Sequence, residues 1–234
     1  MSVSPAKTRS LSGARVLLVG ASGGIGRPLA SALADRGAHL AVAGRDRSRL
    51  SDLGVGERFT FAFDLADEAS AQPLVVAAAE ALGGLDGVIC CAGAVAFGPL
   101  DEIPSDVLHE IVAVDLVGPL MLARAAIPIL PRGGFILNVS GVIAELPTAG
   151  LVTYSAAKAG ISAGFRALAR EVRPRGVSVI DARPPHTETG LAGRPLHGQA
   201  PKMREGLDPA VVAERLVLAI EQDERDVPAS AFTP

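Results

Sequence analysis

The chain holds a single tyrosine, Tyr154, and a lysine follows it four residues later at Lys158. Because an α-helix turns once every ~3.6 residues, the two side chains would be neighbours on one helix face. A nearby ammonium stabilises a phenolate, so we expect Lys158 to lower the pKa of Tyr154 toward the range in which a phenol exchanges a proton with an alcohol or a ketone. The same spacing fits an exposed pair on an ordinary helix surface, and the pair alone does not separate the two interpretations.

A glycine-rich segment, Gly20-Ala-Ser-Gly-Gly-Ile-Gly26, follows an apolar run near the other end of the chain and opens a predicted helix. Its glycines permit a tight turn and a close approach of the backbone to a pyrophosphate, and the helix N-terminus offers free N–H groups. A glycine-rich turn that binds nothing is the alternative. In this context we expect a dinucleotide site that includes Gly20, Ser22, Gly23, Gly24, Ile25 and Gly26.

The end of the second predicted strand bears on which dinucleotide is bound. Enzymes that use NAD usually carry an acidic residue there, which accepts a hydrogen bond from the ribose 2′-OH. Gly44 occupies that place, Arg45 follows it and Arg47 lies nearby. A guanidinium suits a phosphate, although any arginine is also at home in solvent. We therefore predict that NADP(H) is preferred over NAD(H).

Short β-branched runs alternate with longer Ala- and Leu-rich stretches along the chain. The expected strands are residues 15–20, 39–43, 58–63, 87–91, 134–139 and 177–182, with an edge strand near 227–232. The expected helices are residues 24–36, 68–82, 105–129, 153–172 and 209–222. This alternation predicts right-handed β-α-β crossovers and an α/β fold of the Rossmann type, a doubly wound parallel sheet with helices on both faces.

Length and composition favour one domain. Of the 234 residues, 49% are hydrophobic and 3% aromatic, which suits parallel strands built from Ala, Val, Leu and Ile and covered on both faces. We expect residues 11–234 to form a single domain, residues 1–10 to be a disordered tail, and the Gly- and Pro-rich segment 190–204 to be a loop or lid over the site.

Charge and cysteine usage exclude several partners. The net charge of −3 offers no basic footprint for nucleic acid, and no apolar stretch is long and uninterrupted enough to suggest a membrane span. The two cysteines, Cys90 and Cys91, are adjacent and cannot form a disulfide framework, which fits a reducing cytoplasm. No pattern suggests a metal site.

Taken together, the Tyr-x-x-x-Lys pair and the glycine-rich segment resemble the short-chain dehydrogenase/reductase family, from about Leu11 to the C-terminus. The resemblance implies that Tyr154 gives or takes the catalytic proton, and that Lys158 lowers its pKa and holds the nicotinamide ribose. It also implies a nicotinamide cofactor, a small carbonyl or alcohol substrate, and a homodimer or homotetramer whose helices 105–129 and 153–172 pair across a two-fold axis.

Further cofactor contacts follow from the same resemblance. Asp64 would accept from the adenine amino group with Leu65 near the base, although Asp64 is also a candidate N-cap for the next helix. Cys91, Ala92 and Gly93 stand where the family has the end of Asn-Asn-Ala-Gly and would border the ribose.

The segment Pro184-Pro185-His186-Thr187-Glu188-Thr189 resembles the family's Pro-Gly-x-x-x-Thr. It implies that Pro184, Thr187 and Thr189 contact the nicotinamide side, while Pro185 stiffens a wall that is usually glycine.

Two catalytic positions depart from the family pattern. The serine that polarises the carbonyl corresponds to Gly141, and Ser140 lies one residue earlier. Neighbouring strand residues face opposite sides, so Ser140 replaces it only if a bulge re-aims the chain; otherwise it is a satisfied loop hydroxyl. The relay asparagine corresponds to Asp115, which could pair with Lys158 or satisfy backbone donors at a helix kink.

Two hypotheses remain. The first is an NADP(H)-dependent oxidoreductase that interconverts a carbonyl and a secondary alcohol on a small, largely apolar substrate, with Glu145 and His186 as the few polar candidates in the substrate pocket. The second is a non-redox protein on the same fold, either a cofactor-binding regulatory or scaffold subunit or an acid–base lyase or isomerase. Retention of Tyr154, Lys158 and Arg45 favours the enzyme, because a scaffold has no need of the phenol.

Overall fold

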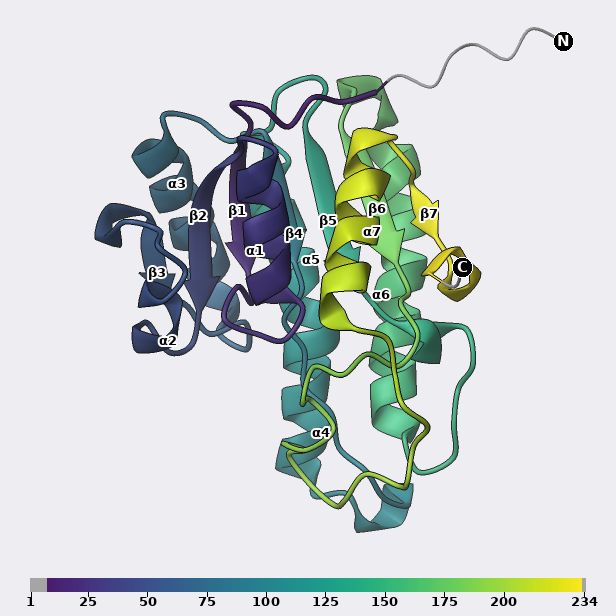
Figure 1. The fold of residues 1–234 in the computed structure, drawn as a ribbon. Helices are drawn as coiled ribbons and strands as arrows, with labels where there is room; N and C mark the ends of the chain where they lie inside the picture. Colours follow the sequence, from purple (N-terminus) through teal and green to yellow (C-terminus); the bar gives the residue numbers. More distant parts are fainter. Residues whose placement is uncertain (1–7, 233–234) are drawn as a thin grey trace, which may run out of the picture.

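Within residues 8–232, the part of the chain that the computed structural model describes, seven parallel strands form one twisted sheet (Figure 1). The strands are β1 (Arg15–Val19), β2 (His39–Gly44), β3 (Thr60–Ala62), β4 (Gly87–Cys90), β5 (Phe135–Val139), β6 (Ser178–Ala182) and β7 (Asp226–Val227). Their order in the sheet is β3-β2-β1-β4-β5-β6-β7. This order is that of a doubly wound Rossmann-type sheet, so the predicted fold class is confirmed.

Helices cover both faces of the sheet. They are α1 (Gly26–Asp35), α2 (Ser48–Ser51), α3 (Ala71–Leu82), α4 (Ser105–Val112), α5 (Gly118–Ala126), α6 (Val152–Glu171) and α7 (Pro209–Glu221). Helices α1 and α7 lie side by side over one face, and α3, α5 and α6 cover the other (Figure 1). The short α2 follows β2 and has too few residues to show a helical period in the sequence.

The core consists of two apolar layers, one on each side of the sheet. Because successive strand residues point to opposite faces, Leu18 packs with Leu29 of α1 and Leu216 of α7, whereas Leu17 belongs to the layer that contains Phe165 of α6. All five residues are less than 2% exposed. Burial on both faces explains why the central strands read as continuous apolar runs.

The connections place a crevice at the carboxyl ends of β1 and β4. These strands are neighbours, yet the chain leaves β1 toward β2 on one side and returns to β4 on the other. The loops that follow them, which begin at Gly20 and Cys91, therefore separate. In open α/β sheets this reversal point is where ligands bind.

The long helix expected over residues 105–129 is interrupted. Helix α4 ends at Val112, a π-helical segment covers Ala113–Val117, and α5 begins at Gly118. Pro119 explains the break, because it lacks the N–H that an unbroken α-helix would donate to the carbonyl of Asp115. The interruption places Asp115 in a wider turn of the kind often found at functional sites.

The two ends of the described chain also differ from expectation. The last strand is Asp226–Val227 rather than 227–232, since Pro228 cannot donate to the ladder, and a 3₁₀ turn follows at Ala229–Phe232. Residues 1–7 of the expected tail lie outside the described residues. Arg9 is anchored: it donates to the carbonyl of Ile220 at 2.7 Å and pairs with Asp223 at 2.9 Å.

Two further properties hold for residues 8–232. No helix in this range is long and apolar enough to cross a membrane. No cluster of three or more His, Cys, Asp or Glu side chains in the same range is arranged to hold a metal ion.

Candidate active site

A cavity of about 530 Å³ opens at the carboxyl ends of the strands and contains most of the residues singled out from the sequence. Those that line it are Gly20, Ser22, Gly23, Gly24, Ile25, Arg45, Asp64, Leu65, Cys91, Ala92, Gly93, Ser140, Tyr154, Lys158, Pro184, Thr187 and Thr189. Gly26 and Asp115 do not line it. Gly26 begins α1 beneath the glycine-rich turn, and Asp115 lies behind Lys158.

The glycine-rich turn admits no side chains at three of its positions. A Cβ on Gly20, whose φ is +85°, would lie 2.6 Å from the amide nitrogen of Ala92. A Cβ on Gly24 would lie 2.5 Å from the Cα of Thr189, and one on Gly26 would lie 2.1 Å from the carbonyl oxygen of Gly20. The turn is therefore packed against the segments after β4 and β6, and its bare backbone borders the cavity directly in front of α1.

The end of β2 carries two arginines at the cavity rather than one. Arg45 and Arg49 both line it, both are exposed, and among residues 8–232 neither side chain has a carboxylate within ion-pair distance. Arg49 lies on α2 and was missed by the sequence analysis. Arg47, mentioned there, instead donates to the carbonyl of Glu57 at 3.2 Å and is not part of the lining. Asp46 also lines the cavity, where hydrogen bonds from Ser48 keep the pKa of its carboxyl below the usual value.

Asp64 has a local role that differs from the cap considered above. Its carboxylate accepts from the amide of Ala66 at 3.0 Å, which closes a tight turn after β3. Asp67 is the residue that caps the following 3₁₀ turn, since it accepts from the amide of Ala69. Asp64 lines the cavity beside Leu65, and its second carboxylate oxygen remains available as a hydrogen-bond acceptor.

Tyr154 and Lys158 share a face of α6, and both line the cavity. The ammonium lies 5.7 Å from the centre of the Tyr154 ring. It is buried, donates to the carbonyl of Val139 at 3.1 Å, and is 2.9 Å from Oδ1 of Asp115. The bare backbone of Gly93 packs against the Lys158–Asp115 ion pair, since a Cβ there would lie 2.9 Å from Oδ1 of Asp115 and 3.4 Å from the Lys158 ammonium.

Asp115 has both roles that the sequence suggested for it: it pairs with Lys158, and it accepts a hydrogen bond from the backbone. It is fully buried, pairs with Lys158, and accepts from the backbone amide of Ala94 at 3.3 Å. Burial raises the pKa of the Asp115 carboxyl, while the Lys158 ammonium acts in the opposite direction. The same carboxylate raises the pKa of Lys158 and keeps that side chain charged despite burial.

The expected lowering of the Tyr154 pKa is wrong for this arrangement of residues. Burial raises the pKa of the phenol above its ordinary value, Lys158 lowers it, and the Asp115 carboxylate raises it again. The net direction of the pKa shift is upward, because burial outweighs the effect of the ammonium and the Asp115 carboxylate adds to the rise. Tyr154 is therefore a phenol, and not a phenolate, around neutral pH.

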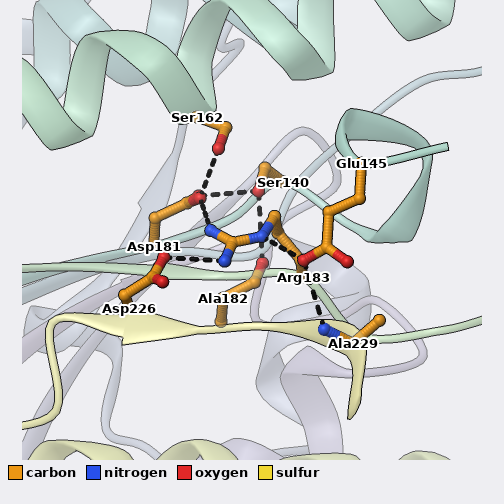
Figure 2. Close-up of polar contacts among 8 residues, drawn as sticks. All are labelled: Ser140, Glu145, Ser162, Asp181, Ala182, Arg183, Asp226 and Ala229. Carbon is orange, nitrogen blue, oxygen red and sulfur yellow. Dashed lines mark hydrogen bonds and ion pairs between the residues drawn. The ribbon is translucent and has the colours of Figure 1, made fainter. Parts of the chain in front are cut away.

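Ser140 borders the cavity, but its hydroxyl is bonded to the polar network of the sheet. Its hydroxyl donates to Oδ1 of Asp181 at 2.6 Å, and only 1% of the residue is exposed (Figure 2). Gly141, which stands at the family's serine position, has a φ of +99°, a conformation that disfavours a side chain. Of the two alternatives for Ser140, the structure therefore matches the satisfied hydroxyl. No hydroxyl replaces the family's serine in this arrangement.

The wall opposite the glycine-rich turn is mostly apolar. It is formed by Val95, Phe97, Val139, Val142, Ile143, Leu151, Leu191, Ala192, Leu196 and Met203. His186 is part of the lining and lies 3.2 Å from Glu188, whereas Glu145 turns away from the cavity to pair with Arg183. Arg194, which the sequence analysis did not single out, also reaches the lining.

The segment expected to be a loop or lid, residues 190–204, covers this apolar part of the cavity. An isolated bridge between Thr187 and Leu207 joins the chain on either side of the segment, and Leu196, near its middle, donates to the carbonyl of Val95 at 2.8 Å. The segment, which forms the yellow-green loops between β6 and α7 in Figure 1, thus contributes directly to the lining of the cavity.

Fold and site together define a class: a Rossmann-type α/β protein whose crevice joins a glycine-rich helix N-terminus to a Tyr–Lys pair. The sequence model of the family described as short chain dehydrogenase matches residues 14–199. Glycine betaine reductase ATRR of Emericella nidulans is 32% identical over 95% of this chain, which spans only 19% of that protein. The uncharacterized oxidoreductase YghA of Escherichia coli is 30% identical over 92% of this chain and 79% of its own length.

A solved structure supports the same assignment. A short chain dehydrogenase from Burkholderia cenocepacia J2315, determined in complex with NADP, superimposes with a TM-score of 0.81 at 25% identity, over 96% of this chain and 100% of that one. The chain belongs to the short-chain dehydrogenase family and is an oxidoreductase of that class.

Proposed function

We propose that the protein is an NADP(H)-dependent oxidoreductase that interconverts a carbonyl and a secondary alcohol on a small, largely apolar substrate. The observation that carries the proposal is the position of Tyr154 and Lys158 in the same cavity as the glycine-rich turn. NADPH oxidation measured against a panel of small ketones, aldehydes and quinones tests it. The apolar wall supports a hydrophobic substrate, because few polar side chains are present to orient a hydrophilic one.

The residues present fit a dinucleotide. The Gly20–Gly26 turn presents bare backbone to the cavity at the start of α1, where a diphosphate could approach it, and Arg45 and Arg49 offer charged donors for a 2′-phosphate. Lys158 would hold the nicotinamide ribose, and Thr187, Thr189 and Pro184 would border the nicotinamide. When bound, the cofactor supplies or accepts the hydride.

Tyr154 performs the proton chemistry in this proposal. In reduction the phenol donates its proton to the carbonyl oxygen, and the Lys158 ammonium stabilises the phenolate that remains. In oxidation the phenolate takes the alcohol proton. Since Ser140 donates to Asp181 and Gly141 has no side chain, Tyr154 is also the donor that stabilises negative charge developing on the substrate oxygen. Its raised pKa keeps the phenol protonated around neutral pH, which is the form that carbonyl reduction requires.

Arg45→Ala should weaken NADPH binding by about tenfold or more and leave NADH binding nearly unchanged, because a charge-assisted hydrogen bond to phosphate contributes ~1.5–3 kcal/mol. Arg47→Ala is the matched control: it removes an arginine two residues away that points to Glu57 and does not line the cavity. Fluorescence titration of both cofactors measures the effect. Equal or tighter binding of NADH to the unmodified protein would contradict the NADP(H) preference.

Ser140→Ala should change kcat/KM by less than about tenfold while lowering stability, because the hydroxyl serves Asp181 and a hydrogen bond to a charged group contributes ~1.5–3 kcal/mol. Chemical denaturation and steady-state kinetics measure the two effects separately. A larger loss of kcat/KM at unchanged stability would mean that the serine turns toward the substrate during catalysis.

We also propose that the protein forms a homodimer or homotetramer. Its proposed location is the cytoplasm, and we expect it to bind neither nucleic acid nor membranes. Large apolar side chains remain exposed on the paired helices, with Leu120 of α5 at 37% and Val152 of α6 at 46%. Light scattering at micromolar concentration should therefore report at least a dimer. A monomer under these conditions would contradict this part of the proposal.

A non-redox role on the same fold is the second candidate. The observation in its favour is the loss of two family functions at once: the Asp115 carboxylate neutralises Lys158, and no hydroxyl stands at Gly141. A protein that binds NADPH but oxidises it with no member of the carbonyl panel would support this second candidate over the first.

A further inference from the structure

Arg183 lies at the centre of a buried ionic junction next to the cavity (Figure 2). Each of its three guanidinium nitrogens donates to a different carboxylate: Nε to Glu145 at 2.5 Å, Nη1 to Asp181 at 2.5 Å and Nη2 to Asp226 at 2.7 Å. The arginine side chain is only 6% exposed. No feature of the sequence pointed to this cluster, since its members come from distant parts of the chain.

The junction connects four elements. Asp181 belongs to the end of β6 and Arg183 directly follows that strand, while Asp226 belongs to β7 and Glu145 to the turn after β5. Asp181 additionally accepts from Ser140 at the end of β5 and from Ser162 of α6, at 2.6 and 2.7 Å. Arg183 thus compensates a fully buried carboxylate, and removing the arginine outright would leave that charge unpaired.

The Glu145–Arg183 pair, one arm of this junction, attaches a wall of the cavity to the chain after β6. Glu145 ends the turn that begins at Gly141, and the residues between them include Val142 and Ile143, which line the cavity. The turn has two backbone bonds to the chain at the end of β6: the amide of Gly141 donates to the carbonyl of Ala182 at 3.3 Å, and the amide of Val142 donates to the carbonyl of Pro184 at 2.9 Å. Both bonds hold its first residues, whereas the Glu145–Arg183 ion pair holds its far end, and Arg183 directly precedes Pro184.

The same arm reaches the C-terminal edge of the sheet. The Glu145 carboxylate also accepts from the amide of Ala229 at 3.3 Å, immediately after β7. The wall is therefore held by side-chain contacts to segments 38 and 84 residues away in sequence. Loops that lack such contacts are free to move, whereas productive catalysis needs the substrate held close to its reacting groups.

From this geometry we propose that Arg183, acting through Glu145, is a positioning residue that fixes the Gly141–Ile143 wall against the Pro184 wall and thereby orients the carbonyl substrate toward Tyr154. The proposal rests on the proposed reductase function. Arg183 does not line the cavity itself. We therefore expect its loss to change how the substrate is oriented, and not the affinity for the cofactor.

Glu145 offers the cleaner test, because it is 32% exposed and its loss leaves the buried Arg183–Asp181 pair intact. Glu145→Ala should lower kcat/KM for a carbonyl from the panel by about 10- to 100-fold, with the Kd of NADPH unchanged, since a misplacement of about 1 Å costs up to ~10²-fold. Glu145→Gln keeps an oxygen that accepts from Arg183 and should recover most of the loss. The matched control is Glu224→Gln, which alters a bidentate carboxylate–Arg215 pair that has no contact with the cavity.

Hydrogen–deuterium exchange supplies a readout that does not depend on turnover. The amides of residues 142–145 should exchange faster in Glu145→Ala than in the unmodified protein or the Glu224→Gln control. Unchanged exchange, or faster exchange with unchanged kcat/KM, would overturn the positioning role while leaving the reductase function intact. If the unmodified protein turns over no carbonyl, the proposed reductase function is wrong, and the proposed role in orienting a carbonyl substrate is wrong with it. The exchange measurement then still shows whether Glu145 anchors the wall.

Discussion

Tyr154→Phe should lower kcat for carbonyl reduction by about 10²–10⁴-fold, the usual contribution of general acid catalysis. The ring packs as before and only the hydroxyl is lost, so NADPH affinity should be nearly intact. Because Ser140 and Gly141 supply no second donor to the substrate, we expect the loss to lie toward the upper end of this range. Single-turnover kinetics with NADPH and a substrate from the panel measure the chemical step.

Lys158 provides the companion variant, with one complication. Lys158→Ala should weaken both NADPH binding and turnover, but it also leaves Asp115 as an unpaired buried carboxylate, which typically costs ~3–5 kcal/mol of stability. Lys158→Ala combined with Asp115→Asn avoids that charge and separates misfolding from lost function. If Tyr154→Phe keeps near-full activity, the reductase mechanism is wrong and the non-redox role replaces it.

Much of the fold was predictable because its signals are local. Buried parallel strands produce continuous apolar runs such as Val16–Val19, and glycines such as Gly37 mark the ends of helices. The segment 105–129 was predicted as one helix with a possible kink at Asp115, but not as two α-helices separated by a π-helical segment, although Pro119 was a signal for the break. The edge strand was placed too late because the apolar residues after Pro228 pack as a 3₁₀ turn, and a tail was extended over Arg9, whose partners are more than 120 residues away.

The candidate site shows the same division. Residues in contiguous motifs, such as the glycine-rich turn and the Tyr154–Lys158 pair, lie together at the cavity because each motif is positioned by its own helix. Arg49 and Arg183 escaped the sequence analysis, because their importance comes from contacts formed only in the folded chain. The direction of the Tyr154 pKa was wrong for the same reason: spacing predicts the ammonium beside the phenol, but not how deeply the pair is buried.

Asp115→Asn is expected to lower the pKa of Tyr154. The carboxylate now raises that pKa and neutralises Lys158, and an amide in its place carries no charge. A lower pKa means that the phenolate forms at lower pH. Alcohol oxidation, which needs the phenolate, should then begin at lower pH, and carbonyl reduction, which needs the phenol, should begin to fall at lower pH.

The amino-acid composition allows the pKa of Tyr154 to be measured without turnover. Tyr154 is the only tyrosine and the chain has no tryptophan, so titration of the tyrosinate absorption band reports this one residue. Asp86→Asn is the matched control: it alters an ion pair with Arg15 at the amino ends of β1 and β4, where the strands begin and not where the cavity opens. It should leave both the absorption titration and the pH–rate profiles unchanged. If Asp115→Asn also leaves them unchanged, the Asp115 carboxylate does not control the pKa of the phenol.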